Sequence, residues 1–427
     1  MPLLRSAPHH LRSLVVALAT SFAIPCFVAA QPSANSHAAP GVPFDAIRLA
    51  RIDSMVQKLV TDQRIPGAVV MLVRDGNVAY HKAFGVRDIG TKAPMQRDDI
   101  FRMASQTKAI TSLAAMMLWE EGRFQLDDPI SNYLPEFKQM KVLTKFNASD
   151  SSYDAKPTQR RITIRQLFTH TSGLDYPSIG SEEFRAIYAK AGVPSGIGTD
   201  GAVLADKIGI LATLPLKHEP GERFTYGLSV DVLGRLVEVL SGTPLDQFFR
   251  RRIFVPLKMN DTWFALPADR HSRLVALHQE KDGKLTSSRA VDGELDPDYP
   301  NHDIKYFSGG AGLSGPIGDY ARFLQLFVNG GELDGVRLLS RKTVDMMLTN
   351  QIGTLQPAFG LGFALETAQN DFSNPATIGS FSWGGAFATS YWADPKERLV
   401  ALIYTNIYGS TARTGEIFKT LVYSALR

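Results

Sequence analysis

The chain has 427 residues, of which 44% are hydrophobic and 21% charged, a composition typical of a globular protein able to bury a sizeable core. Its 46 basic and 42 acidic residues leave a formal net charge of +4, without the clustered basic stripe of a nucleic-acid-binding protein. The single cysteine excludes an intrachain disulfide. Two GxGxxG matches, starting at Gly196 and Gly310, do not follow an apolar strand and are interpreted as loops, and zinc-ligand spacings are absent.

The first thirty residues have the layout of a secretory signal peptide. Two arginines precede an uncharged apolar run over residues 14–30, which ends in small residues. We therefore expect cleavage near Ala30 and export to the periplasm or the medium, with Cys26 lost. A membrane anchor is the poorer interpretation, because the run is barely long enough and Pro25 interrupts it. Residues 31–45 are expected to form a flexible leader, and the mature protein should not be held in a membrane.

The mature chain begins with a helix and a hairpin. Apolar residues at helical spacing predict a helix over residues 46–62. Two β-rich runs at 68–74 and 78–84 flank Asp75-Gly76, a hairpin turn signal. A second, buried helix is predicted over residues 105–121.

The middle of the chain alternates short helices with polar loops. The loops at 146–161 and 279–303 are charged and weakly apolar, so they are predicted to be surface insertions. The predicted helices cover residues 165–170, 230–240, 245–253, 318–329 and 340–349.

The last fifty residues return to strand character. Runs at 391–393 and 399–405 flank a turn signal, and 414–426 predicts a closing helix. This order favours an α/β (α+β) fold with a central antiparallel sheet built from both chain ends, flanked by helices, and a mainly helical inserted domain. The predicted domains are the sheet domain, 46–128 plus 378–427, and the helical domain with its loop insertions, 129–377.

An SxxK element, Ser105 to Lys108, stands at the start of the predicted buried helix. Residues three apart share a helix face, so the Lys108 amine can reach the Ser105 hydroxyl. A serine needs an adjacent base at neutral pH, and a lysine whose charged form is disfavoured by burial can be that base. The helix N-terminus adds N–H groups where negative charge develops. The alternative, a capping Ser105 and a solvated Lys108, fits poorly with a helix that is apolar on nearly all faces.

Two later segments carry further candidate residues. Tyr226 stands in a turn before the helix predicted at 230–240, where its phenol could reach a site; the alternative is a core tyrosine with a satisfied hydroxyl. Trp383-Gly384-Gly385-Ala386 precedes the last hairpin, and adjacent glycines in a strand favour a close approach of backbone or ligand. The alternative for this segment is a bulge beside a core tryptophan.

Taken in order, these three elements resemble the serine β-lactamase-like superfamily. The similarity is greatest to the family VIII carboxylesterases and related transesterases, whose fold resembles that of class C β-lactamases. It extends over nearly the whole mature chain. Residues 162–174 are similar to the family segment TIRxLLTHTSGL, residues 220–226 to PGxxFxY, and residues 256–259 to PLGM.

The resemblance implies a role for each candidate residue. Ser105 would be acylated, while Lys108 and Tyr226 would share proton transfer as a coupled pair in which the base is undecided. The oxyanion hole would be the backbone N–H groups of Ser105 and Ala386. His170 lies in a matched segment but is not an acid–base residue of the family. No metal or cofactor is implied, and the implied substrate-binding residues are Trp383, Gly384, Gly385 and Leu228.

Two departures from the penicillin-recognising pattern concern the substrate. Leu228 stands where those enzymes have Asn, and Trp383 where they have a Lys or His, whose lysine helps to hold a substrate carboxylate. An indole offers an apolar wall instead, so the expected function is a carboxylesterase that hydrolyses neutral, short-chain small-molecule esters through an acyl-Ser105 intermediate. The alternatives are a β-lactamase, D-aminopeptidase or DD-peptidase with the same site, and a catalytically silent binding protein of this fold.

Overall fold

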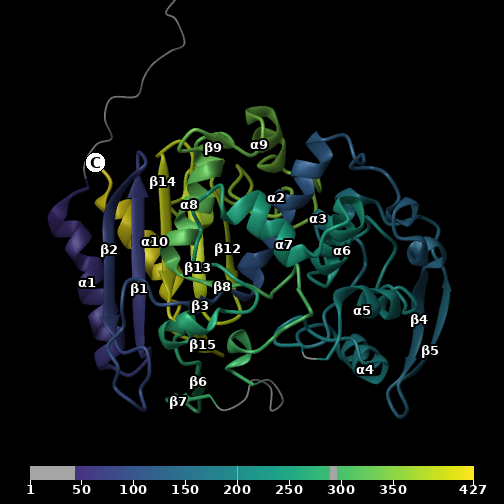
Figure 1. The fold of residues 1–427 in the computed structure, drawn as a ribbon, viewed down its shortest axis with the longest axis horizontal. Helices are drawn as coiled ribbons and strands as arrows, with labels where there is room; N and C mark the ends of the chain where they lie inside the picture. Colours follow the sequence, from purple (N-terminus) through teal and green to yellow (C-terminus); the bar gives the residue numbers. More distant parts are fainter. Residues whose placement is uncertain (1–43, 200, 289–295) are drawn as a thin grey trace, which may run out of the picture. The chain divides into compact units, whose positions relative to one another are not determined.

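The computed structural model describes residues 44–199, 201–288 and 296–427 (Figure 1). The predicted signal peptide and nearly all of the predicted leader lie outside these residues. Asp45, at the end of the predicted leader, caps α1 (Ala46–Thr61), because its carboxylate accepts hydrogen bonds from the backbone N–H groups of Ile47 and Arg48. In the described part of the chain no helix is both long and apolar enough to cross a bilayer.

Six of the described strands form an antiparallel sheet in the order β11-β12-β13-β14-β1-β2 (Figure 1). Their bounds are β1 (Gly67–Arg74), β2 (Asn77–Gly85), β11 (Ala364–Leu365), β12 (Phe381–Gly385), β13 (Thr389–Asp394) and β14 (Leu399–Tyr404). Because β1 pairs with β14, the two ends of the chain meet inside the sheet, with Met71 opposite Leu402. The predicted fold class, an antiparallel sheet from both chain ends with flanking helices, is confirmed.

Strand β1 is buried on both faces, as its unbroken apolar run requires. Ala68, Val70 and Leu72 pack with α1 and with the closing helix α10 (Thr414–Ala425). Val69, Met71 and Val73 belong to the larger core, which includes α2 (Thr107–Glu120) and α8 (Ile317–Val328). The sheet therefore separates two hydrophobic layers, and α2, which follows Ser105, lies in the larger one.

Helix α6 packs against α2 and against α3, and so it brings the middle of the chain to the predicted nucleophile. The structure also contains two helices, α4 and α5, that were not predicted. The helices of the middle region are α3 (Ile164–Phe168), α4 (Glu182–Ala191), α5 (Leu204–Leu211), α6 (Ser229–Ser241), α7 (Leu245–Phe249) with a following π-helical turn, and α9 (Arg341–Met347).

Both predicted surface loops contain hairpins. β4 (Lys141–Asn147) and β5 (Ser152–Pro157) pair across most of the first loop. β6 (His278–Lys281) and β7 (Lys284–Ser287) pair at the start of the second, where β6 also joins β15 (Ile407–Tyr408). Strands β4 and β5 expose most of their residues, so no apolar alternation marks them in the sequence.

Four strands of two residues complete the described strands. One pair matters for the site, because β3 lies just before the SxxK element and pairs with β8, just after Gly310. Their bounds are β3 (Phe101–Arg102), β8 (Ser314–Gly315), β9 (Glu332–Leu333) and β10 (Val336–Arg337).

Candidate active site

Ser105 lies in a single 3₁₀ turn, η1 (Ala104–Gln106), and α2 begins two residues later than predicted. Ala104 holds a φ of 45°, a left-handed conformation that is unfavourable for a residue with a Cβ. Hydrogen bonds to distant residues fix the turn on both sides of Ser105. Met103 N–H donates to the Leu313 carbonyl at 2.9 Å, and the Gln106 carbonyl accepts a hydrogen bond from the Tyr320 hydroxyl at 2.9 Å.

The structure brings Ser105, Lys108 and Tyr226 together. Lys108 Nζ donates to Ser105 Oγ at 3.2 Å, and the Tyr226 hydroxyl donates to the same oxygen at 2.5 Å. Lys108 is 3% exposed, so its ammonium is not a solvated first-turn group. Ser105 Oγ therefore has two groups within reach that could take its proton, which is the arrangement of an activated nucleophile.

Aromatic rings surround the phenol of Tyr226. The Tyr176 ring stacks on it at a centroid distance of 5.7 Å, and the Trp383 ring is tilted against it at 5.4 Å. Lys108 Nζ lies 4.7 Å from the centroid of the Tyr226 ring and 5.4 Å from that of Tyr176, so it makes cation–π contacts with both rings. Tyr176 was not among the predicted site residues, because a single tyrosine in a loop carries no sequence signal of its own.

His170 is buried behind this cluster with its ring 4.8 Å from that of Tyr226. Burial, and then the charge of Lys108, lower the pKa of His170 well below its usual value, so the imidazole is neutral at neutral pH. The neutral His170 ring also packs against Phe224 and Phe359, so it supports the Tyr226 ring by packing and not by proton transfer.

The third predicted segment forms the end of β12. A side chain at Gly385 would place its Cβ 2.3 Å from the Met103 carbonyl oxygen, so the absence of one lets β12 approach the backbone just before Ser105. Gly384 is similarly confined, with the Thr389 carbonyl oxygen 2.9 Å from an added Cβ. Ala386 follows directly and is exposed.

Leu228 differs from the sequence-based expectation. It directly precedes α6, and its side chain is 1% exposed within the main core. It offers almost no surface to a substrate, so we leave it out of the proposed binding surface. Its apolar character is explained by this burial.

The segment after Ser308 also binds Lys108 Nζ. The Gly310 carbonyl accepts a hydrogen bond from Lys108 Nζ at 2.8 Å. Two threonines of α2 also bind this segment, because Thr111 donates to the Gly309 carbonyl at 2.7 Å and Thr107 accepts from Leu313 N–H at 3.1 Å. The second GxGxxG match is a loop only over residues 310–313, because its last two residues form β8. That this loop holds the Lys108 ammonium was not predicted from the sequence.

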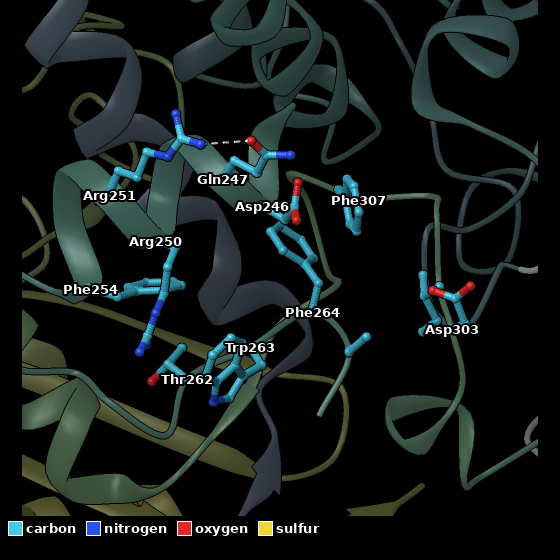
Figure 2. Close-up of a pocket in the computed structure, with 12 residues that line it drawn as sticks. Asp246, Gln247, Arg250, Arg251, Phe254, Thr262, Trp263, Phe264, Asp303 and Phe307 are labelled. Carbon is cyan, nitrogen blue, oxygen red and sulfur yellow. Dashed lines mark hydrogen bonds between the residues drawn. The ribbon is translucent and has the colours of Figure 1, made fainter. Parts of the chain in front are cut away.

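Two cavities of the described structure differ in whether a predicted site residue lines them. One, of about 720 Å³, is lined by Trp383, by Ser390 of β13 and by the first residues of α10. The other, of about 310 Å³, contains none of the predicted site residues; Figure 2 shows Trp263 and Phe264 on one side of it and Arg251 of the π-helical turn, bonded to Gln247, on the other. The larger cavity is therefore the one that adjoins the candidate site.

Comparison with known families decides the assignment. The family model described as Beta-lactamase matches residues 52–422. This chain belongs to that family. The resemblance to the serine β-lactamase-like superfamily is confirmed, and the family match includes Ser105, Lys108, Tyr226 and Trp383 within its limits.

Several members of the wider group are esterases or acyltransferases. Esterase EstB of Burkholderia gladioli is 31% identical over 383 residues, which cover 85% of this chain and 91% of that protein. Monacolin J acid methylbutanoyltransferase of Aspergillus terreus is 31% identical over 392 residues, covering 83% and 89%. Among solved structures, EstCE1, a hydrolase with promiscuous acyltransferase activity, matches with a TM-score of 0.75 at 28% identity, covering 88% and 99%. The chain is an enzyme of the β-lactamase-fold hydrolase and acyltransferase family.

Within residues 44–199, 201–288 and 296–427, no group of three or more His, Cys, Asp and Glu side chains is arranged to hold a metal ion.

Proposed function

We propose that this chain is a serine carboxylesterase that hydrolyses short-chain acyl esters through an acyl-Ser105 intermediate. The observation that carries the proposal is the pair of contacts to Ser105 Oγ, from Lys108 Nζ at 3.2 Å and from the Tyr226 hydroxyl at 2.5 Å. A serine held in this way can transfer its proton as its oxygen attacks a carbonyl carbon.

The proposed acylation proceeds in two steps. Ser105 Oγ bonds to the carbonyl carbon while its proton passes to the Lys108–Tyr226 pair, and the backbone N–H groups of Ser105 and Ala386 receive the charge that develops on the carbonyl oxygen. The bond from carbon to the alcohol oxygen then breaks, and the pair returns the proton to that oxygen. Water, activated by the same pair, then attacks the acyl carbon and releases Ser105 and the acid.

The choice of an ester over a β-lactam rests on Trp383. Penicillin-recognising enzymes place a cation at this position, and here a half-buried indole packs against Tyr226 and Phe359. An apolar wall favours a neutral acyl group over an anionic one. The esterase EstB and the hydrolase EstCE1 support the same substrate class.

The test compares p-nitrophenyl butyrate with a chromogenic cephalosporin on wild type, Ser105→Ala and Ser112→Ala. Ser112 is a buried serine of α2, the helix that follows Ser105, and no role in the reaction is proposed for it, so it serves as the control. We expect Ser105→Ala to lower ester turnover at least about a thousandfold, and Ser112→Ala to retain it. Butyrylation of intact wild type, detected by mass spectrometry, should disappear in Ser105→Ala.

Three results would contradict the proposal. Ester turnover that survives Ser105→Ala would remove the mechanism. Fast cephalosporin hydrolysis with slow ester hydrolysis would make the enzyme a β-lactamase. A folded wild type without turnover of either substrate would favour the silent binding protein.

A further inference from the structure

Asp231 is a fully buried acid that the proposed reaction does not use. It lies in the first turn of α6, five residues after Tyr226, and has no exposed surface. Its Oδ1 accepts hydrogen bonds from the Ser308 hydroxyl at 2.5 Å and from Gly310 N–H at 3.2 Å. Its Oδ2 has no hydrogen-bond partner among the described residues. A buried carboxylate with one free oxygen is unfavourable unless a nearby charge compensates it.

Gly310 connects Asp231 to the lysine. Its N–H donates to Asp231, and its carbonyl accepts from Lys108 Nζ at 2.8 Å. Ser308 Oγ also accepts from Ala311 N–H at 3.0 Å, which closes the turn around the carboxylate. The close packing around Asp231 and Ser308 depends on two glycines. An added Cβ on Gly310 would lie 2.3 Å from Asp231 Oδ2, and one on Gly196 would lie 2.4 Å from Ser308 Oγ.

The charged and titratable groups that interact with this carboxylate in the described structure come from separate segments of the chain. Lys108 of α2 is the cation of the set, and its charge acts on both Asp231 and His170. Tyr176 and Tyr306 also interact electrostatically with Asp231, and the Tyr176 ring stacks on that of Tyr226. Burial raises the pKa of Asp231, and the charge of Lys108 and the two hydrogen bonds oppose that rise.

We propose that Asp231 is a positioning residue for the Lys108–Tyr226 pair. Through the Ser308–Gly310 turn it holds Lys108 against Ser105, and its negative charge sets the pH at which the pair loses its proton. The inference rests on the proposed function of Ser105. Removing a negative charge favours the deprotonated form of the pair, whichever member is the base, so the acid limb of the pH profile must move to lower pH.

The test is Asp231→Asn, which keeps the size of the side chain and an oxygen for Ser308 and Gly310. We expect the acid limb of kcat/KM for p-nitrophenyl butyrate to move by about one unit to lower pH. Asp394→Asn is the matched control. Asp394 is also 0% exposed and accepts the backbone N–H groups of Lys396 and Glu397 and the Tyr423 hydroxyl, but in the described structure it forms no ion pair with a lysine side chain. Its profile should stay at the wild-type position.

A second measurement does not depend on ester turnover. Methyl p-nitrophenyl butylphosphonate forms a bond from Ser105 Oγ to phosphorus and releases p-nitrophenolate, so its rate reports activation of Ser105 alone. In Asp231→Asn the pH dependence of this rate should shift with that of kcat/KM. If Asp231→Asn does not fold, Ser308→Ala removes one link of the turn and should lower kcat about tenfold with KM retained, because Lys108 is less well held.

The outcomes separate the two proposals. A wild type that shows neither Ser105-dependent turnover nor phosphonylation would remove the proposed function. An active wild type with a superimposable Asp231→Asn profile would overturn the charge role of Asp231. Wild-type kcat in Ser308→Ala would overturn its positioning role.

Discussion

At the scale of the residue, Trp383 both packs against other aromatic rings and lines a cavity. One side of the indole packs against Tyr226, whose hydroxyl contacts Ser105, and against Phe359, whose ring is perpendicular to it at 5.4 Å. The residue also lines the cavity of about 720 Å³. A partly buried residue that packs against a proposed catalytic side chain and also lines a cavity is placed to contact substrate and to orient the phenol.

We therefore predict that Trp383→Ala lowers kcat/KM for p-nitrophenyl butyrate by about 10- to 100-fold, because the apolar wall and a ring contact of Tyr226 are lost. Steady-state kinetics measure the effect, and circular dichroism checks that the protein folds. Trp119→Ala is the control, since Trp119 is a partly buried tryptophan at the far end of α2. Kinetics equal to wild type in Trp383→Ala would mean that the indole only fills the core.

Two site residues show what a sequence can and cannot predict at this scale. Lys108 was predictable because the three-residue spacing from Ser105 and the apolar helix around it are both local in the sequence. Asp231 was not, because an acid in the first turn of a helix is usually an exposed partner of the helix dipole. Only the packing of α6 against α2, and the turn at Gly310, make it a buried neighbour of Lys108.

At the scale of the element, the site depends on how closely β12 approaches η1. The two are in contact, and Gly385 is the residue that permits it, because an added Cβ would lie 2.3 Å from the Met103 carbonyl oxygen and 2.4 Å from Thr389 Oγ1. Real Cβ atoms do not occupy such positions, so the strand would have to move. That movement would displace the N–H of Ala386 from the proposed oxyanion hole.

We predict that Gly385→Ala lowers kcat for p-nitrophenyl butyrate about a hundredfold or more while KM changes less, because a misplaced donor acts on the transition state. Gly209→Ala is the matched control. Gly209 lies inside α5 with nothing within 4 Å of an added Cβ, so alanine there should leave kcat unchanged and stabilise the fold by about 0.5–1 kcal/mol. A Gly385→Ala enzyme with wild-type kcat would remove Ala386 from the proposed mechanism.

The elements differ in how well their sequence predicted them. The helices at 46–62, 318–329 and 414–426 were placed to within a residue or two, because each has an apolar stripe at helical spacing. The β4–β5 hairpin was missed, since its strands pair with each other and bury little. The 3₁₀ turn at Ser105 was also missed, because its shape is imposed by Leu313 and Tyr320, which are distant in sequence.

At the scale of the whole molecule, the sheet joins the chain ends, so acid-sensitive groups in distant segments act on one folding equilibrium. Among the residues that the structure describes, four histidines have a lowered pKa, with burial as the first cause for each: His81, His170, His218 and His278. A histidine whose folded pKa is lowered binds fewer protons in the folded state, so stability is lost as pH falls below the unfolded value. Asp319 has the opposite effect on stability. Burial raises its pKa to about 6, so the folded protein binds this proton more readily than the unfolded chain, and the contribution of Asp319 to stability rises as pH falls.

His278 allows the sharpest test of this balance. It is 0% exposed, Ile89 N–H donates to its Nε2 at 3.3 Å, and burial lowers its pKa from 6.5 to about 4. Between these two values the unfolded chain binds the proton that the folded protein does not. From pH 7.5 to pH 5 this one residue should therefore lower the free energy of unfolding by about 2 kcal/mol.

We predict that His278→Gln, which keeps an acceptor for Ile89 N–H but cannot be protonated, reduces the loss of stability on acidification by about that amount. Urea denaturation at the two pH values measures it, and the comparison with wild type cancels the opposing effect of Asp319. His302→Gln is the control, because solvent reaches 41% of that side chain in the folded protein. An equal acid loss in wild type and His278→Gln would show that the buried imidazole takes up its proton without unfolding.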